Sequence, residues 1–369
     1  MTASSDFTVG TLTDRLADRF PLDWAEPWDA VGLRIGDRRA RTGRVCVTLD
    51  ADVRSLEAAC GEGCGTLVTH HPPFLGHPGS LTGDTPEGRF ILAAAGRGIA
   101  VVSMHTNLDR SPEGADALPL LLGLSPEHPL EESSVEVDVV TVFVPAAARA
   151  GVVAAIAAAG GGRIGLYEAC SFTSSGEGRF TARAGARSAT GRSGSSAEPE
   201  DRLEMVVPAG AAEAAVAAAR AAHPYEEPVI LVTRATLSRG VARLGRVCSV
   251  TETRLGALAT HVAELLCVRP RIWGDADRRV TRVAVANGSG SSLVGAAIAS
   301  EAQALIVGEV RYHDAMAALN SGLALIEAGH DATEWPIVDV LAAECRAILG
   351  DAAVLRAPTR MAWWTGERA

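Results

Sequence analysis

The stretch that decides the fold of this chain is Gly65-Thr66-Leu67-Val68-Thr69-His70-His71-Pro72-Pro73. Residues 65–69 form an apolar, β-branched run that begins at a glycine and is stopped by a pair of prolines, which predicts a short buried strand. His70 and His71 therefore lie at the carboxyl end of that strand. Open α/β sheets place their ligand sites at this end of their strands.

The two neighbouring histidines have two interpretations. On a regular strand they would point to opposite faces, but at a strand end before prolines their rings can splay around one cavity. Each would then offer a nitrogen ligand to one of two metal ions. For a bare His-His-Pro the commoner alternative is that one ring is hydrogen-bonded in the core and the other faces water. Other segments have to decide between them.

Composition limits the classes of protein to which the chain can belong. It has 369 residues and a formal net charge of −10. The length predicts two or three folding units. Because Lys/Arg-rich blocks are missing, the sequence argues against a nucleic-acid-binding protein, which needs a concentrated basic face.

Two further features concern the compartment. The seven cysteines are scattered without a CxxC pair, which predicts reduced thiols and a cytoplasmic protein. The first residues lack the basic and apolar regions of a signal peptide, and glycines or prolines interrupt every apolar stretch before membrane-spanning length. We therefore expect neither a signal peptide nor a membrane helix.

Residues 1–130 are predicted to form a first α/β lobe. After an opening helix that ends at Pro21, strand and helix patterns alternate, which predicts a parallel sheet covered by helices. The strand over 99–104 runs into His105-Thr106-Asn107-Leu108-Asp109. If it lies beside the strand that ends at His70, Asp109 reaches the same sheet edge, where a carboxylate could bridge two ions. A turn or capping role is the commoner alternative for this aspartate.

Residues 131–238 follow a different order. Strand, helix, strand, strand, helix and strand are predicted, which is the split βαβ order of a ferredoxin-like module. The two halves are separated by residues 175–202, a Gly-, Ser- and Arg-rich stretch that predicts a mobile loop. The segment His223-Pro224-Tyr225-Glu226-Glu227 precedes the last strand. A solvated turn and a functional site are equally compatible with it.

Residues 239–369 return to the alternating pattern and predict a second α/β lobe. Its turn Asn287–Ser292 joins a strand to a helix, so it is either a tight turn or a cradle for an anion. Glu309 and His313 follow another strand end, where helix capping explains part of the polar density. His330 and Glu334 follow a third strand at a spacing that places both on one helix face. This spacing suits a metal site, but a surface pair is the alternative.

Taken in order, these motifs resemble the GTP cyclohydrolase 1 type 2 homologue family, also called the Nif-three-like family, over nearly the whole chain. The motifs are Trp28-Asp29-Ala30-Val31-Gly32-Leu33, Thr69-His70-His71-Pro72, His105–Asp109, His223–Glu227, Gly308–His313 and Gly329-His330 with Glu334. Two positions depart from the family pattern. Ala30 stands where an asparagine is frequent, and Gly185–Ala189 replaces a more apolar stretch.

The resemblance implies a fold, an assembly and a ligand set. Two α/β lobes would enclose a dinuclear metal cleft, a ferredoxin-like (PII/CutA-like) insertion would separate them, and trimers would build a homohexamer. The resemblance places the metal ligands on His70, His71, Asp109, His330 and Glu334. With three nitrogen and two oxygen ligands, the two divalent ions could be Zn, Fe, Mn, Co or Ni.

Two classes of function are compatible with this resemblance. Two divalent ions against two carboxylates leave a positive surplus that would attract an anionic small molecule. We therefore expect a metal-dependent hydrolase of a phosphorylated or nucleotide-like compound, with metal-bound hydroxide as nucleophile and His105, Glu309 and His313 as catalytic candidates. The alternative is a non-catalytic metal-binding scaffold or regulator whose insertion senses a ligand or partner. The cyclohydrolase name serves only as a label.

Overall fold

The computed structural model describes residues 7–26, 28–76, 79–131, 134–164, 167–187, 189, 194–238 and 240–359. The residues outside these ranges include both ends of the chain and residues 132, 133 and 239 at the boundaries of the predicted insertion. They also include five positions of the predicted loop, 188 and 190–193. The chain divides into two compact units: residues up to Ser133 together with those from Gly240 onward, and residues Ser134–Arg239.

The first sheet of unit 1 contains the strand that ends at His70. Its order is β1-β4-β3-β2-β15, with β1 antiparallel to β4 and the other pairs parallel. The strands are β1 Gly32–Ile35, β2 Arg44–Thr48, β3 Cys64–Thr69, β4 Ala100–Ser103 and β15 Val354–Arg356. The register pairs Thr69 with Ser103. The prediction that the strand before His105 lies beside the strand before His70 is therefore confirmed.

Helices around this sheet begin at well-defined caps. The side chains of Thr8, Asp52, Thr85 and Ser111 each accept a hydrogen bond from a backbone N–H in the first turn of the helix that follows. Such a cap contributes about 1 kcal/mol. The helices are α1 Val9–Arg19, α2 Val53–Gly61, α3 Pro86–Gly96, α4 Thr106–Asp109 and α5 Pro112–Leu121, with a 3₁₀ turn η1 over Leu22–Trp24.

The second sheet of unit 1 has the order β11-β14-β13-β12-β10-β5. Its central strands β12, β13 and β14 are parallel, and β11, β10 and β5 each run antiparallel to the neighbour with which they pair. The strands are β5 Ser125–Pro129, β10 Arg246–Arg254, β11 Arg271–Trp273, β12 Arg279–Val285, β13 Ala304–Val307 and β14 Ala324–Glu327. The helices are α8 Leu255–Leu266, α9 Val294–Ala299, α10 Tyr312–Asn320 and α11 His330–Leu349, with 3₁₀ turns η2 Ser291–Leu293 and η3 Asp351–Ala353.

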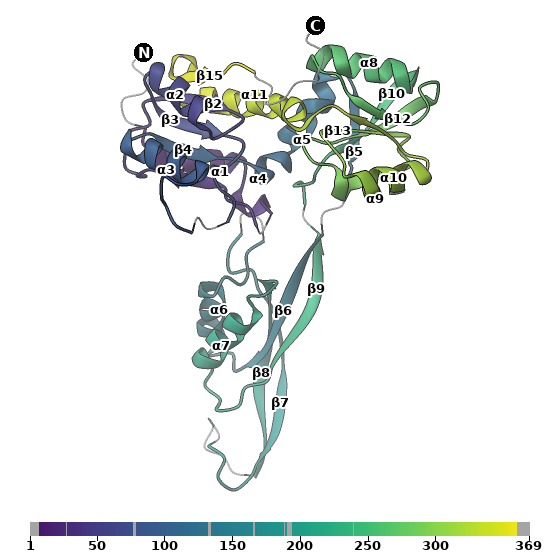
Figure 1. The fold of residues 1–369 in the computed structure, drawn as a ribbon. Helices are drawn as coiled ribbons and strands as arrows, with labels where there is room; N and C mark the ends of the chain where they lie inside the picture. Colours follow the sequence, from purple (N-terminus) through teal and green to yellow (C-terminus); the bar gives the residue numbers. More distant parts are fainter. Residues whose placement is uncertain are drawn as a thin grey trace. The chain divides into compact units, whose positions relative to one another are not determined.

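The two sheets do not correspond to the parts of the chain before and after the insertion, because each sheet includes one strand from the other part. β5 precedes that position but pairs with β10 in the second sheet, while β15 near the end of the described chain pairs with β2 in the first. Helix α11 links the two cores, because Ala332 packs in the second core and the residues from Trp335 onward pack in the first (Figure 1). Its first turn therefore lies where the sheets meet.

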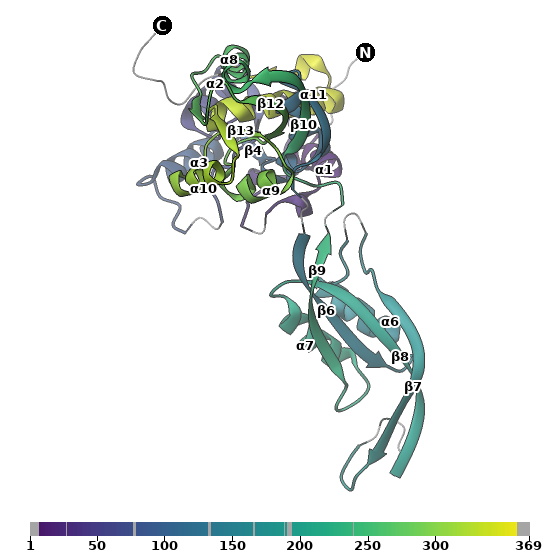
Figure 2. The same cartoon turned by 90° about the vertical axis from the view of Figure 1, so that its right-hand side faces the viewer.

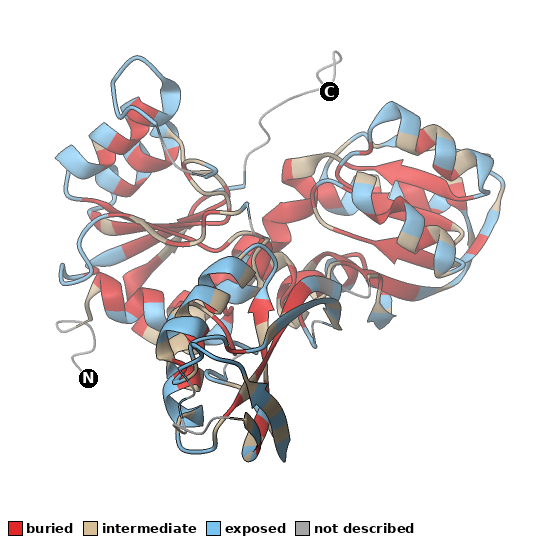
Figure 3. Cartoon of the chain, turned by 90° about the horizontal axis from the view of Figure 1, so that it is seen from below, coloured by how far each residue is buried: buried red, intermediate tan, exposed pale blue. Residues whose placement is uncertain are grey.

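Unit 2 is an antiparallel sheet with two helices. Its elements are β6 Ser134–Val144, α6 Arg149–Ala158, β7 Phe172–Ala182, β8 Gly194–Pro208, α7 Ala212–Ala222 and β9 Ile230–Ser238, and the sheet order is β7-β8-β6-β9 (Figure 2). Alternate residues of β6 and β8 face α6 and α7 and form the core. Figure 3 shows buried residues, in red, along the strands of unit 1, while the helices carry both red and pale blue segments because one face of each is buried.

The expectation of a mobile loop over residues 175–202 was wrong. Strands β7 and β8 pair continuously from Phe172–Glu204 to Ala182–Gly194 and form a long hairpin. Most of β7 is exposed on both faces, so the sequence carries no apolar alternation that would reveal a strand. Backbone hydrogen bonds and polar contacts hold the pairing instead, such as that of the Ser175 hydroxyl with Asp201 at 2.7 Å.

Among the described residues, none of the helices combines the length and the apolar character that a membrane span requires.

The segments that flank unit 2 lie side by side, which predicts that this unit can be removed from the chain. Leu130 N–H donates to Gly245 O at 3.2 Å and Glu131 N–H donates to Leu244 O at 3.3 Å, so unit 1 itself holds the two attachment points together. Replacing residues 134–239 with a short Gly/Ser linker should leave a folded unit 1 that binds metal. Thermal unfolding and elemental analysis check this. Insoluble protein, or folded protein without metal affinity, would contradict it.

Candidate metal centre

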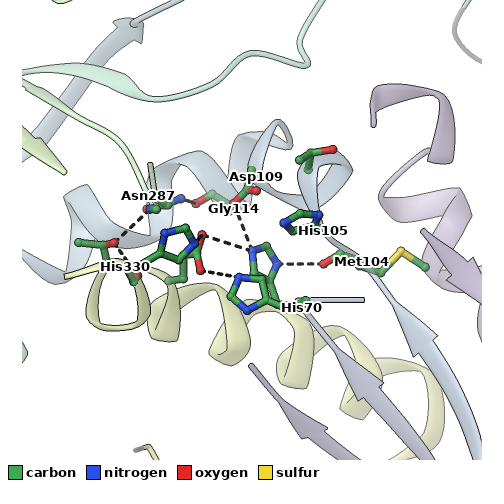
Figure 4. A network of polar contacts seen from close by, with 12 residues as sticks. His70, Met104, His105, Asp109, Gly114, Asn287 and His330 are labelled. Atoms are coloured by element: carbon green, nitrogen blue, oxygen red, sulfur yellow. Dashed lines mark hydrogen bonds and ion pairs between the residues drawn. The ribbon is translucent and has the colours of Figure 1, made fainter. Parts of the chain in front are cut away.

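The sequence-predicted ligands come together where the two sheets meet. His70 and His71 follow β3, Asp109 ends α4, and His330 and Glu334 lie in the first turns of α11. Figure 4 shows His70 and Asp109 directed toward each other, with His105 and His330 on either side. Three groups have ligand atoms within 4.8 Å of one another: His70, Asp109 and Glu334; His71, His330 and Glu334; and His70, His71 and His105.

His70 presents a lone pair to the centre. Its Nδ1 lies 2.9 Å from the backbone carbonyl oxygen of Met104, and because a carbonyl only accepts, Nδ1 must carry the hydrogen. The neutral ring then has an unprotonated Nε2, which lies 3.6 Å from Asp109 Oδ1 and 3.8 Å from Glu334 Oε1. His70 Nε2 and Asp109 Oδ1 are buried without a hydrogen-bond partner. Two acceptors that face each other in this way require a cation or a proton.

Glu334 lies at the middle of the cluster. Its side chain is only 4% exposed, and its Oε1 is 3.1 Å from His330 Nε2. Its Oε2 is 2.8 Å from His71 Nε2, which makes the two side chains an ion pair when the His71 ring is protonated. The carboxylate belongs to two of the three metal-ligating groups. Glu334 is therefore common to two candidate sites for a metal ion.

Three carboxylates orient the remaining histidines. Nδ1 of His71 lies 2.9 Å from Asp50, Nδ1 of His105 lies 2.8 Å from Asp29, and Nδ1 of His330 lies 2.9 Å from Glu309. This carboxylate–histidine arrangement is typical of metal sites, because it fixes the ring and leaves Nε2 for the ion. The donor set and its supports therefore fit a divalent metal.

The orienting role of Asp50 and Asp29 was missed at the level of sequence. Asp50 follows the strand beside β3 and so reaches the same sheet edge, a signal of the kind that identified Asp109. Asp29 stands in one of the quoted motifs. Burial alone would raise the pKa of Asp29, but His105, Thr106 and the Ala30 N–H outweigh it and lower the pKa to about 2. This carboxylate is therefore ionised at neutral pH.

The three catalytic candidates have different positions. Glu309 contacts His330 and holds its ring, and both Glu309 and His330 are partly exposed. His105 joins the centre, with ring centroids 5.2 Å from His70 and 5.5 Å from His71. His313 is exposed on α10, and its ring contacts Tyr312. It is absent from the three groups found among the described residues, because the first turn of α10 directs it outward.

The charges of the centre keep protons on two histidines. Burial by itself lowers the pKa of His71, but Asp50 and Glu334 outweigh it and raise the pKa to about 10. Burial is likewise outweighed at His330 by Glu309 and Glu334, which raise its pKa to about 11. Burial raises the pKa of Asp109. At Glu334 the surrounding histidines overcome burial and hold the pKa well below its usual value.

The turn over residues 287–292 lies against the centre. A Cβ on Gly288 would be 2.3 Å from Glu334 Oε1, so this position requires glycine. The N–H groups of Gly288 and Gly290 already donate to Thr333 Oγ1 at 3.1 Å and Glu309 O at 2.9 Å. The turn is therefore a close backbone approach, and these two N–H groups do not serve the anion cradle that the sequence allowed.

Comparison with known proteins places the chain among well-defined relatives. The model of the family described as Duf34/NIF3 (NGG1p interacting factor 3) matches residues 7–356. Relatives called GTP cyclohydrolase 1 type 2 homolog include one from Mycobacterium tuberculosis, 34% identical over 342 residues that cover 89% of this chain and 88% of the relative. Another, from Bacillus subtilis, is 33% identical over 317 residues, with 84% of each chain covered.

Solved structures agree in fold. A Bacillus cereus protein related to NIF3 matches with a TM-score of 0.62 at 28% identity, covering 94% of this chain and 96% of that one. The Staphylococcus aureus protein SA1388 matches with a TM-score of 0.63 at 24% identity, covering 94% and 93%. The α/β architecture with several sheets is therefore shared with these proteins.

Metal binding should release protons. At about pH 7 the imidazoles of His71 and His330, with pKa values of about 10 and 11, are protonated in the metal-free protein. An ion must displace both protons, so about two should be released per chain and the metal affinity should rise with pH. Calorimetric titration with Zn²⁺ in buffers of different ionisation enthalpy measures the number. Affinity that stays constant between about pH 6 and pH 8 would contradict this prediction.

Removing an orienting carboxylate should weaken the metal site without dismantling it. Asp50→Ala frees the His71 ring and is expected to lower metal affinity about 10- to 100-fold. Asp37→Ala, which removes an exposed aspartate that pairs with Arg39, is the matched control. Competition against a metal indicator measures both affinities. Equal affinities for the two variants would show that Asp50 does not support the centre.

Proposed function

The chain belongs to the Duf34/NIF3 family, and from this membership and the geometry of its polar centre we propose that it is a dinuclear metal-dependent hydrolase of a phosphorylated or nucleotide-like small molecule. The observation that carries the proposal is the convergence of buried acceptors. Among the described residues, His70 Nε2 and Asp109 Oδ1 have no hydrogen-bond partner, and together with the buried Glu334 carboxylate they offer a cation nitrogen and oxygen ligands.

Two overlapping groups support two ions rather than one. His70, Asp109 and Glu334 would hold the first, and His71, His330 and Glu334 the second, with Glu334 in common. No thiolate belongs to either group, and nitrogen and oxygen ligands suit Zn, Fe, Mn, Co or Ni. Ions held in this way supply Lewis acidity to a phosphoryl oxygen and activate water.

The protein's own residues position the reaction and move protons. Asp29 holds Nδ1 of His105, which leaves Nε2 of that ring as the nitrogen able to exchange a proton at the centre. Glu309 keeps the His330 ring in place, so we assign it a positioning role. The outward direction of His313 supports no part in this chemistry.

A second candidate function is supported by a cavity in unit 2. We infer that this unit is a ferredoxin-like, PII/CutA-like insertion. It contains a cavity of about 320 Å³ between the β7–β8 hairpin and the 225–229 segment. His223 makes this turn rigid, since its Nε2–H donates to Phe143 O at 2.9 Å and its Nδ1 accepts from the Tyr225 N–H at 3.0 Å. Ligand sensing by this cavity would fit a metal-binding regulator, assembled as the hexamer that the family suggests.

The hydrolase proposal predicts joint loss of metal and turnover. Wild-type protein should carry close to two divalent ions per chain, as dinuclear hydrolases do. His71→Ala and Glu334→Ala should lose most of this metal and lower turnover of a phosphoester and nucleotide panel by at least about 100-fold. Glu301→Ala, at an exposed position, is the control.

Elemental analysis and turnover assays with each metal read out this prediction. Less than about one ion per chain in metal-replete protein would refute the dinuclear site. Metal-loaded protein without turnover, combined with a ligand that binds unit 2, would favour the regulator instead.

A further inference from the structure

The carboxylates around the candidate metal centre would weaken its attraction for an anionic substrate. The sequence-based count set two divalent ions against Asp109 and Glu334 alone. The structure adds the orienting carboxylates Asp29, Asp50 and Glu309. With these included, five carboxylates exceed the four positive charges of two divalent ions by one. Binding of a multiply charged anion therefore needs cationic side chains beyond the metals.

One surface pocket of unit 1 offers such side chains beside the centre. It has a volume of about 510 Å³, and we call it the arginine pocket. His330 and Glu309 belong both to its wall and to the candidate metal centre. A group bound in the pocket would thus be a direct neighbour of a group held at the metals. Its lining includes Arg269, Arg271, Glu309, Glu327, Gly329 and His330.

Arg271 is anchored by a buried carboxylate. Arg271 and Glu327 are opposite each other on the antiparallel strands β11 and β14. Glu327 is 6% exposed, and its Oε1 accepts from the Val310 N–H at 2.7 Å. Its Oε2 accepts from Trp273 Nε1 at 2.8 Å and lies 3.3 Å from Arg271 Nη1. Both oxygens of Glu327 therefore have partners, and the carboxylate forms an ion pair with one end of the guanidinium.

The remaining donors of Arg271 are available to a ligand. The side chain is 71% exposed although one end is held, and a guanidinium has five N–H donors in a fixed fork. A guanidinium that is already held at one end loses less conformational freedom when it binds a phosphoryl group through two hydrogen bonds. Arg271 is thus better suited to recognise an anion than an unanchored surface arginine.

Two glycines form part of the wall between the pocket and the centre. Gly308 and Gly329 both line the pocket. A Cβ on Gly308 would lie 2.5 Å from Gly288 O and 2.8 Å from the Cα of His330. Gly329 has a φ of 98°, a conformation that other residues rarely adopt. These two positions therefore place no side chain between the pocket and His330.

We propose that the arginine pocket binds a second phosphoryl group of the substrate, next to the group held at the metals. The substrate class is then a diphosphate, such as a nucleoside diphosphate or another diphosphate ester, rather than a simple phosphomonoester. This inference rests on the proposed metal-dependent hydrolysis. Arg271 is the specificity residue, because it contacts the phosphoryl group that does not react.

The test compares pyrophosphate with inorganic phosphate as ligands of the metal-loaded full-length protein. Titration calorimetry should show that wild-type protein prefers pyrophosphate by at least about tenfold. Arg271→Gln should reduce this preference to about twofold while leaving phosphate affinity nearly unchanged. Arg254→Gln, at an exposed arginine paired with Asp277, should behave like wild type. Elemental analysis after each titration verifies that pyrophosphate has not removed the metal.

The outcomes separate this inference from the proposed function. If Arg271→Gln keeps the wild-type preference in protein that retains metal and turnover, the pocket assignment is wrong and the hydrolase proposal stands. If the wild-type protein holds no metal, the hydrolase proposal fails, and titration of that protein still tests the pocket. Pyrophosphate binding that Arg271→Gln weakens about tenfold would then support the pocket alone, and equal binding by both proteins would overturn it.

Discussion

The main physical constraint on this structure is a pair of buried hydrogen-bond acceptors that lack a donor. Among the described residues, His70 Nε2 and Asp109 Oδ1 face each other 3.6 Å apart, and neither has a hydrogen-bond partner. Each buried unsatisfied group costs about 1–3 kcal/mol, so the arrangement is unfavourable for the protein alone. A divalent ion would turn the same lone pairs into ligands. The energetic cost of burying these acceptors is therefore the physical reason to expect a cation between them.

The fold produces this arrangement by bringing distant segments to one place. The parallel register of β3 and β4 places His70 near Asp109, and α11 brings His330 and Glu334 because it extends from the second core into the first. The exchange of β5 and β15 ties the two sheets together. Both sheets must consequently be in place for the candidate ligands to meet, so metal binding at this centre would depend on the integrity of unit 1.

The sequence predicted the features that depend on strand ends. The carboxyl ends of neighbouring parallel strands share one edge, so residues such as His70 and Asp109 could be expected together without any coordinates. Features that depend on pairing over long distances were not predictable. The exchanged strands are short and carry no signal of their partner. Strand β7 (Phe172–Ala182) has two polar faces, and its pattern resembles that of a loop.

The carboxylates that orient the histidines were harder to predict than the candidate metal ligands. Asp50 and Asp29 matter through contacts with His71 and His105, and a contact between segments 21 and 76 residues apart is not visible in spacing. The direction of a side chain at a helix start also needs coordinates. Glu309 faces the centre, and His313 four residues later faces solvent.

The central claim is that two ions share Glu334, and anomalous diffraction from metal-loaded crystals tests it most directly. Data collected on both sides of the metal absorption edge should show two peaks per chain. One peak should lie about 2.0–2.2 Å from ligand atoms of His70, Asp109 and Glu334, and the other at the same distances from His71, His330 and Glu334. Peaks outside these two groups, or fully loaded crystals with no peak at Glu334, would contradict the account.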